Sequence, residues 1–274
     1  MIKILNDLKL IDRNREWIGA PRVSIWHKAS YYAAIFLCYV QLILTKNKCI
    51  KYLGKDYIFD NPATPLNLQN YPFEIGMKIL KNMDRDPKKV LDAGANTGQF
   101  ACTLAAMVPG VIIHSFEPNP QIAKILQKNL KVFSKQSKVF EYAISNQSST
   151  ETLYFEKNRS AIGSIIRANA SEDSKKITQI SIRATSQPEK LTKIKSYDLI
   201  KVDVEGFEDQ AILGLRGVRT RYLFIEISGS GRTKNFLHSE LFDSIKHTLG
   251  PFEITYIDQF TYKNANFEIL LKFV

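Results

Sequence analysis

The sequence is poor in the residue types that build metal centres and disulfide frameworks. It contains three cysteines and four histidines in 274 residues. Cys38, Cys49 and Cys102 have neither metal-ligand spacing nor an even number, which argues against a small disulfide-stabilised secreted domain and favours a reducing, cytoplasmic compartment. No histidine has a partner at a fixed spacing, so we expect structural histidines and predict no metal site.

The N-terminal region lacks the small-residue cleavage site of a signal peptide. Its charge-free run from Ala29 to Thr45 is short for a membrane span and contains Gln41. Lys28 and Lys46 flank this run, so the positive-inside rule gives no orientation. We predict an N-terminal extension over 1–60 with an apolar helix at 29–45. This helix packs on the domain, contacts a partner or the membrane surface, or spans the membrane.

Acidic residues are also few relative to basic ones. Lysine and arginine number 38 against 27 aspartates and glutamates, which gives a formal net charge of +11. Such a surface favours anionic partners, including phosphate-bearing glycans, nucleotide-sugars, nucleic acid and anionic lipid, although a generally solvated basic surface is the alternative. The length allows one large domain plus an extension.

One segment, from Val90 to Phe100, has the order of a strand, a tight turn and a helix. Apolar residues lead to Asp92, and Gly94 and Gly98 bracket the turn. Turns of this kind hold nucleotide-like ligands at the carboxyl ends of the strands in open α/β sheets. Glycine tolerates backbone angles that a side chain forbids, and it lets a ligand approach the main chain.

The same turn lacks the dinucleotide fingerprint, which requires glycine at three positions. Here those positions hold Gly94, Asn96 and Gln99, so a bound pyrophosphate is not predicted. A nucleoside with a charged amino-acid tail fits better, because Asp92 can receive an ammonium directly or through water. Glu117 ends the next strand about twenty residues past the glycines, the usual spacing for a carboxylate that binds ribose hydroxyls. These features together suggest S-adenosylmethionine.

Three motifs now resemble one family: residues 92–100, 115–120 and 200–208 look like those of the FkbM family of S-adenosylmethionine-dependent methyltransferases. The resemblance covers roughly 70–274. It implies a class I methyltransferase fold and methylation of an oxygen on a sugar or natural product. The segment at Ala143 resembles the family segment beside the adenine. The expected cofactor-binding residues are Asp92, Gly94, Asn96, Thr97, Gly98, Phe100, Glu117, Pro118, Asn119 and Ala143.

The pattern of apolar runs predicts an α/β, Rossmann-like, seven-stranded sheet, mostly parallel, with a C-terminal antiparallel hairpin and helices on both faces. Strands are expected near 89–93, 111–116, 138–144, 197–204, 222–228, 252–258 and 266–273. Helices are expected near 73–83, 98–107, 120–133, 207–216 and 234–249. A hairpin around Gly54-Lys55 precedes them.

A β insertion near 146–196 interrupts this alternation. Residues 150–157 and 177–183 alternate like strands, 160–164 form a small, mobile segment, and 171–176 a polar turn. We expect the insertion to shape the substrate pocket, the alternative being a β extension without ligand contact. Ser186 or Thr185 is expected to cap a helix that begins at Pro188.

The chemistry is predicted at Lys201, Asp203 and Glu205, because charged residues are rare in a buried parallel strand unless paired or functional. Strand alternation places all three on one side. We predict Asp203 as the general base, Glu205 as the second candidate, and Lys201 as a group that pairs with either acid or lowers the pKa of the acceptor. The alternative is a structural ion-pair network at the sheet edge. Glu226 is a further acid at a strand end. It could share a divalent cation with Asp203, although no spacing requires a metal.

The predicted function is therefore transfer of a methyl group from S-adenosylmethionine to a hydroxyl of a sugar, glycan or related natural product. The expected acceptor is a small molecule or glycan, anionic or lipid-linked, with peripheral membrane contact through 29–45. A nucleic-acid methyltransferase acting on a ribose 2′-hydroxyl is the second candidate, and a cofactor-binding scaffold without catalysis the third. The sequence carries no signal for an oligomeric state.

Overall fold

A computed structural model describes residues 48–60, 71–156, 159–165, 177–227, 240–259 and 267–274. The apolar run 29–45 and the polar turn 171–176 lie outside these ranges, as do His27, Cys38 and His238. None of the described helices is long and apolar enough to cross a membrane.

A seven-stranded sheet forms the centre of the fold, in the order β12-β13-β11-β10-β3-β4-β5. Its strands are β3 (Lys89–Ala93), β4 (Ile112–Phe116), β5 (Lys138–Phe140), β10 (Ser196–Val202), β11 (Arg219–Ile227), β12 (Phe252–Gln259) and β13 (Phe267–Phe273). β13 pairs antiparallel with both β11 and β12, and the other pairs are parallel. The predicted mostly parallel sheet with a C-terminal antiparallel hairpin is confirmed. The strand order reverses between β3 and β10, which is where open α/β sheets bind ligands.

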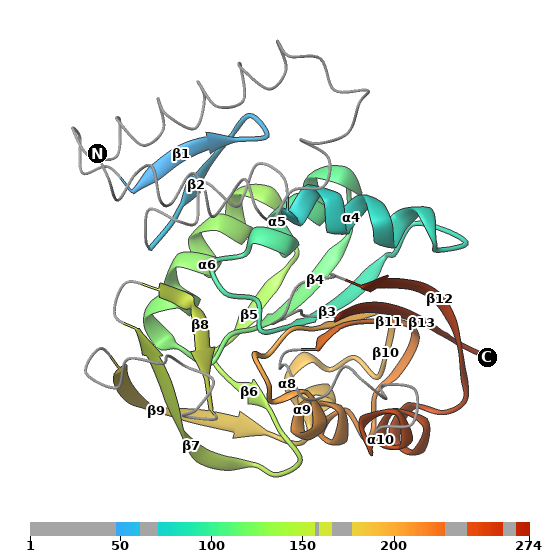
Figure 1. Cartoon of the computed structure of the whole chain (residues 1–274). Helices are drawn as coiled ribbons and strands as arrows, with labels where there is room; N and C mark the ends of the chain where they lie inside the picture. Colours follow the sequence, from blue (N-terminus) through green and yellow to red (C-terminus); the bar gives the residue numbers. More distant parts are fainter. Residues whose placement is uncertain (1–47, 61–70, 157–158, 166–176, 228–239, 260–266) are drawn as a thin grey trace.

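Helices cover both faces of this sheet (Figure 1). On one face lie α4 (Tyr71–Lys81), α5 (Gln99–Met107) and α6 (Pro120–Phe133), and on the other α8 (Pro188–Thr192), α9 (Glu208–Gly214) and α10 (Glu240–Leu249). Alternation along β3 explains the two layers: Val90 belongs to the apolar cluster under the first face, whereas Leu91 and Ala93 belong to the cluster under the second.

The N-terminal hairpin packs against the first face. β1 (Cys49–Tyr52) and β2 (Lys55–Ile58) pair antiparallel, with Tyr52 opposite Lys55. The connecting residues are Leu53 and Gly54, at φ 46° and 77°, so the turn lies one residue before the predicted Gly54-Lys55. Positive φ at both central residues is typical of the tight turn that suits the twist of a hairpin. Tyr57 is fully buried in the same apolar cluster as α5.

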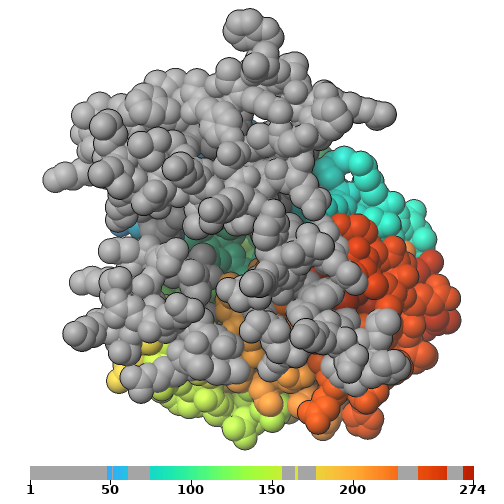
Figure 2. Space-filling view, in the orientation of Figure 1, coloured from blue at the N-terminus to red at the C-terminus, as the bar shows by residue number. Residues whose placement is uncertain are grey.

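A second, four-stranded sheet contains most of the insertion, in the order β6-β9-β7-β8. Its strands are β6 (Ala143–Ile144), β7 (Ser149–Glu156), β8 (Arg159–Ser164) and β9 (Ile177–Thr185). In the orientation of Figure 1, its yellow-green surface lies below, while α4 (cyan) and the C-terminal segments (orange to red) lie to one side (Figure 2).

Three local predictions about this region were wrong. The expected strand 138–144 is two strands, because the chain turns after Phe140, where the Tyr142 amide donates to the Phe140 carbonyl, and β6 joins the second sheet. The segment 160–164 is not a mobile loop but most of β8, since pairing with β7 fixes a sequence with little strand preference of its own. Helix α8 has Gln187 as its N-cap residue, and the Thr185 hydroxyl accepts from the Gln187 amide without capping the helix.

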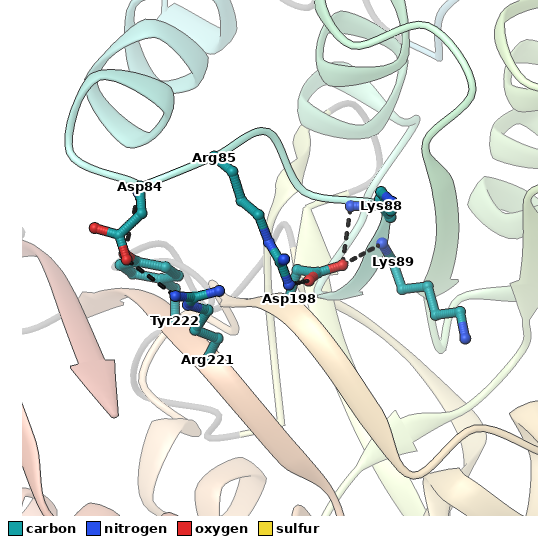
Figure 3. A network of polar contacts seen from close by, with 7 residues as sticks. All are labelled: Asp84, Arg85, Lys88, Lys89, Asp198, Arg221 and Tyr222. Carbon is teal, nitrogen blue, oxygen red and sulfur yellow. Dashed lines mark hydrogen bonds and ion pairs between the residues drawn. The ribbon is translucent and has the colours of Figure 1, made fainter. Parts of the chain in front are cut away.

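A polar network holds the amino ends of the strands, opposite the carboxyl ends where a ligand is expected (Figure 3). One Asp198 carboxylate oxygen accepts the amides of Lys88 and Lys89 at 2.9 Å each, and the other pairs with Arg85 at 3.3 Å. A second set centres on Asp84, which contacts Arg221 and Tyr222. The segment between α4 and β3 is thereby fixed to β10 and β11.

Candidate active site

The turn over residues 94–98, here called the glycine turn, joins the end of β3 to α5. It lies directly against the end of β10. Gly94, Asn96 and Gly98 have φ angles of 79°, 49° and 92°. A side chain at Gly94 would overlap the backbone carbonyl of Asp203, whose amide donates to the Ala93 carbonyl at 3.1 Å. The sequence suggested that glycine at position 94 makes room for a ligand. In the structure, the missing side chain makes room for the end of the neighbouring strand.

The backbone amides of this turn are all used within the protein. They belong to residues 94 to 98 and donate to the Phe116 carbonyl (twice), a Glu117 carboxylate oxygen, the Asn96 side-chain oxygen and the Ala95 carbonyl, at 2.7–3.1 Å. A pyrophosphate site at such a turn requires amides that point at the anion. The turn therefore suits a ligand without phosphate, as the missing fingerprint glycines predicted.

Glu117 lies at the end of β4 and links this turn to the next one. Its two carboxylate oxygens accept the amides of Asn96 and Asn119, both at 2.9 Å. Burial raises the pKa of Glu117 to about 7. Each carboxylate oxygen still has a lone pair for a further donor, so Glu117 can accept hydrogen bonds from a ribose diol. Asn119 also caps α6, because its side-chain oxygen accepts the Gln121 amide at 3.0 Å.

Lys201 is the centre of charge at the end of β10. Its ammonium lies 3.0 Å from an Asp203 oxygen and 3.5 Å from an Asp92 oxygen, and 5.5 Å from the centre of the Phe100 ring. Although burial disfavours the ammonium, the carboxylates of Asp203 and Asp92 hold the pKa of Lys201 above its ordinary value. A raised pKa favours the charged form of Lys201, which lies within ion-pair distance of Asp203.

Asp92 is fully buried on the other side of Lys201. Burial raises its pKa, against the opposing effect of the Lys201 ammonium. Within the described part of the chain its oxygens have no hydrogen bond beyond this ion pair, so they can accept one further donor. Such a site fits an ammonium tail or a bridging water, as the sequence suggested for the cofactor.

Glu205 does not follow the predicted alternation. β10 ends at Val202, and Glu205 lies in the following turn with φ 51°. Its carbonyl accepts the Ser164 hydroxyl at 2.8 Å. Side-chain alternation therefore unites Lys201 with Asp203 but does not apply to Glu205. The Asp203 side chain is 23% exposed, so an acceptor can reach it.

Other predicted residues lie on neighbouring strands, and of these Glu226 is near enough for its carboxylate to help raise the pKa of Lys201. Ala143 belongs to β6 of the second sheet and pairs with Ala184 of β9. Glu226 is buried at the end of β11, opposite Glu268 of β13. His114 is structural, since its ring contacts the Tyr197 hydroxyl at 2.9 Å and burial lowers its pKa to about 4. Within the described ranges, no group of three or more His, Cys, Asp or Glu side chains could hold a metal ion.

Three residues near the site were missed from the sequence: Tyr57, Asn129 and Ser164. Tyr57 and Asn129 hydrogen-bond to Thr97 in the glycine turn, and Ser164 to the turn after β10. Each comes from an element distant in sequence. A weak signal existed only for Asn129, a polar residue on the buried side of an amphipathic helix.

The chain is similar to known proteins in sequence and in fold. A family model described as Methyltransferase FkbM domain matches residues 92–263. No curated protein matches the sequence. Among solved structures, fibrillarin of Aeropyrum pernix with bound S-adenosyl-L-methionine is 14% identical, with 81% of each chain covered and a TM-score of 0.45.

Two further solved structures are similar at the same level. The putative methyltransferase yhhF of Escherichia coli is 11% identical, with 82% of this chain and 99% of that chain covered and a TM-score of 0.46. The N-terminal domain of EvdMO1, in the presence of SAH and D-fucose, is 8% identical, with 75% and 83% covered and a TM-score of 0.45.

Proposed function

This chain belongs to the FkbM methyltransferase family and is an S-adenosylmethionine-dependent methyltransferase, and we propose that it methylates a hydroxyl of a sugar, glycan or related natural product. The observation that carries the proposal is the pairing of a partly exposed carboxylate, Asp203, with a buried ammonium, Lys201, at the carboxyl end of β10. This pair lies directly beside the glycine turn.

The residues present fit the cofactor. Glu117 offers carboxylate oxygens to the ribose hydroxyls, and Asp92 offers unsatisfied oxygens to the amino-acid tail or a water beside it. When bound, S-adenosylmethionine supplies an electrophilic methyl group on a positively charged sulfur. Asp92 and Glu117, both buried beside the turn, favour such a cation.

Asp203 is the proposed general base. A hydroxyl becomes an adequate nucleophile when its proton is removed as the new carbon–oxygen bond forms, and a carboxylate within hydrogen-bond reach can take that proton. Lys201 holds one Asp203 oxygen at 3.0 Å, which leaves the other for the acceptor. Holding the acceptor in line with the methyl group supplies much of the remaining acceleration. Glu205 is the second candidate for the base.

The test is methyl transfer from labelled S-adenosylmethionine by the full chain to neutral saccharides, phosphate-bearing saccharides and RNA. Asp203→Asn should lower turnover by roughly 100-fold or more while the Kd for S-adenosylhomocysteine stays within about twofold, because the change removes the proton acceptor and keeps the shape. The control is Asp243→Asn, which alters an exposed acid on α10 and should leave turnover unchanged. Unchanged turnover in Asp203→Asn would remove Asp203 as the base.

The net charge of +11 favours one alternative, methylation of a ribose 2′-hydroxyl in nucleic acid. That function predicts RNA binding whose affinity falls steeply as salt rises, since released counterions drive such binding. Methylation of saccharides with RNA left unmodified would exclude it.

A further inference from the structure

The β1–β2 hairpin precedes the family match, which begins at residue 92, yet it reaches the glycine turn. The fully buried Tyr57 hydroxyl donates to the Thr97 carbonyl at 3.0 Å and lies 2.9 Å from the Thr97 hydroxyl. A hydroxyl can donate once and accept twice, so both contacts can form together. The hairpin is thereby joined to the centre of the turn.

Asn129 of α6 closes the same connection from the other side. Its side-chain oxygen accepts the Ile58 amide at 2.7 Å, and its side-chain nitrogen donates to the Ile58 carbonyl at 2.7 Å. The same nitrogen donates to the Thr97 carbonyl at 2.8 Å. Asn129 is 1% exposed, so these bonds form away from water, where leaving a polar group unpaired is costly.

Thr97 is therefore fixed by groups outside the turn. Its carbonyl accepts from both Tyr57 and Asn129, and its amide donates to the Asn96 side chain. On either side of it, Asn96 and Gly98 have positive φ. A non-glycine residue keeps such a backbone conformation only where the surrounding structure fixes it. Here the hydrogen bonds from Tyr57 of β2 and Asn129 of α6 fix the turn at Thr97.

We propose that the β1–β2 hairpin positions the cofactor site and that Tyr57 is a positioning residue acting through Thr97. Tyr57 contacts no reacting atom. It holds the turn between Asp92 and α5 in the shape that receives the cofactor, and that turn in turn contacts Glu117 through the Asn96 amide. The proposal rests on the assigned cofactor and is independent of the acceptor.

The test is calorimetric titration of the full chain with S-adenosylhomocysteine, together with thermal unfolding of the ligand-free protein. Tyr57→Phe should raise the Kd by about 3- to 10-fold, the range expected when a single hydrogen bond is lost. The matched control is Tyr52→Phe. Tyr52 is also buried in the hairpin, but its hydroxyl lies 2.7 Å from that of Thr103, further along α5. Tyr52→Phe should lower the melting temperature to a similar extent and change the Kd by less than about twofold.

Thr97→Val provides a second variant. It removes the Thr97 hydroxyl, which lies 2.9 Å from the Tyr57 hydroxyl, and keeps the Thr97 carbonyl that accepts from Tyr57. Because Tyr57→Phe also removes this hydroxyl contact, the fold-change in Kd of the double variant should be smaller than the product of the two separate fold-changes. Where the wild type binds, an unchanged Kd in Tyr57→Phe, or equal Kd changes in Tyr57→Phe and Tyr52→Phe, would overturn the proposal and leave the cofactor assignment standing. Absence of wild-type binding would overturn the cofactor assignment, and this proposal with it.

Discussion

Replacing Lys201 with methionine tests the charge arrangement of the site most directly. The substitution keeps an unbranched side chain of similar length and removes the ammonium that lies 3.5 Å from the fully buried Asp92. A buried charge that loses its partner destabilises a protein by about 3–5 kcal/mol. Asp203 adds little, since its side chain is 23% exposed and water can replace the ammonium.

Protonation of Asp92 sets an upper limit on this loss. Protonating an ordinary aspartate at pH 7 costs roughly 4 kcal/mol, because its pKa lies about three units lower and each unit corresponds to about 1.4 kcal/mol. Burial already raises the pKa of Asp92, and removing Lys201 raises it further. The folded variant then binds this proton more tightly than the unfolded chain does. The deficit relative to wild type should therefore shrink by up to about 1.4 kcal/mol for each unit that the pH falls from 7 towards 5.

The assay is urea denaturation at pH 7 and pH 5.5. Lys272→Met is the matched control. Lys272 lies 3.0 Å from Asp84, but both side chains are partly exposed, so the loss of this ion pair should lower the free energy of unfolding much less than the loss of Lys201 does. Adding Asp92→Asn to Lys201→Met should restore much of the stability, since neither charge then remains buried. The reasoning fails if Lys201→Met costs no more than Lys272→Met, or if the effects of the two site substitutions simply add.

Two further predictions concern the turns that flank the cofactor. Burial raises the pKa of Glu117 to about 7, so its carboxylate loses acceptor capacity as the pH drops from 8.5 to 6, and the affinity of the wild type for S-adenosylhomocysteine should fall over this range. Glu117→Gln should bind more weakly than the wild type at pH 8.5, and its affinity should not change with pH. A wild-type affinity that does not change with pH would contradict this role of Glu117. In the ligand-free protein the sign is opposite, since a raised pKa means that ionisation destabilises the fold as the pH rises from the ordinary glutamate value to about 7. Gly94→Ala should reduce stability by more than the roughly 1–2 kcal/mol expected for positive φ alone, because its added carbon overlaps the Asp203 carbonyl. Gly110→Ala, at φ 87° with open space around it, isolates the φ effect, so equal losses in thermal unfolding would refute the overlap.

The central sheet could be predicted because its signals are local. Buried parallel strands form continuous apolar runs, and α6 begins at residue 120, where Pro120 occupies the first turn and Asn119 supplies the cap. The Lys201–Asp203 pair follows from two-residue alternation, which continues one residue past the end of β10 because the Asp203 amide still donates to the Ala93 carbonyl of β3.

The remaining features depend on contacts between distant segments. Tyr57 and Thr97 are 40 residues apart, and the sequence near neither residue predicts their hydrogen bond. β8 is a strand because β7 lies beside it. The alternation argument failed for Glu205 because the chain leaves the extended conformation after Asp203 and Glu205 has a positive φ, and the sequence does not mark that point.

The hydrogen bonds that Asp198 accepts from the amides of Lys88 and Lys89 limit which insertions and deletions this protein can tolerate. It fixes β10 against β3 at one end, in the register that places Lys201 opposite Asp92 at the other. Because successive side chains point to opposite faces, a one-residue insertion or deletion between Asp198 and Lys201 would turn the ammonium away from Asp92 or break the hydrogen bonds that Asp198 accepts. The apolar residues between them, Leu199 and Ile200, can be exchanged for others of similar size, but the length of the segment cannot change.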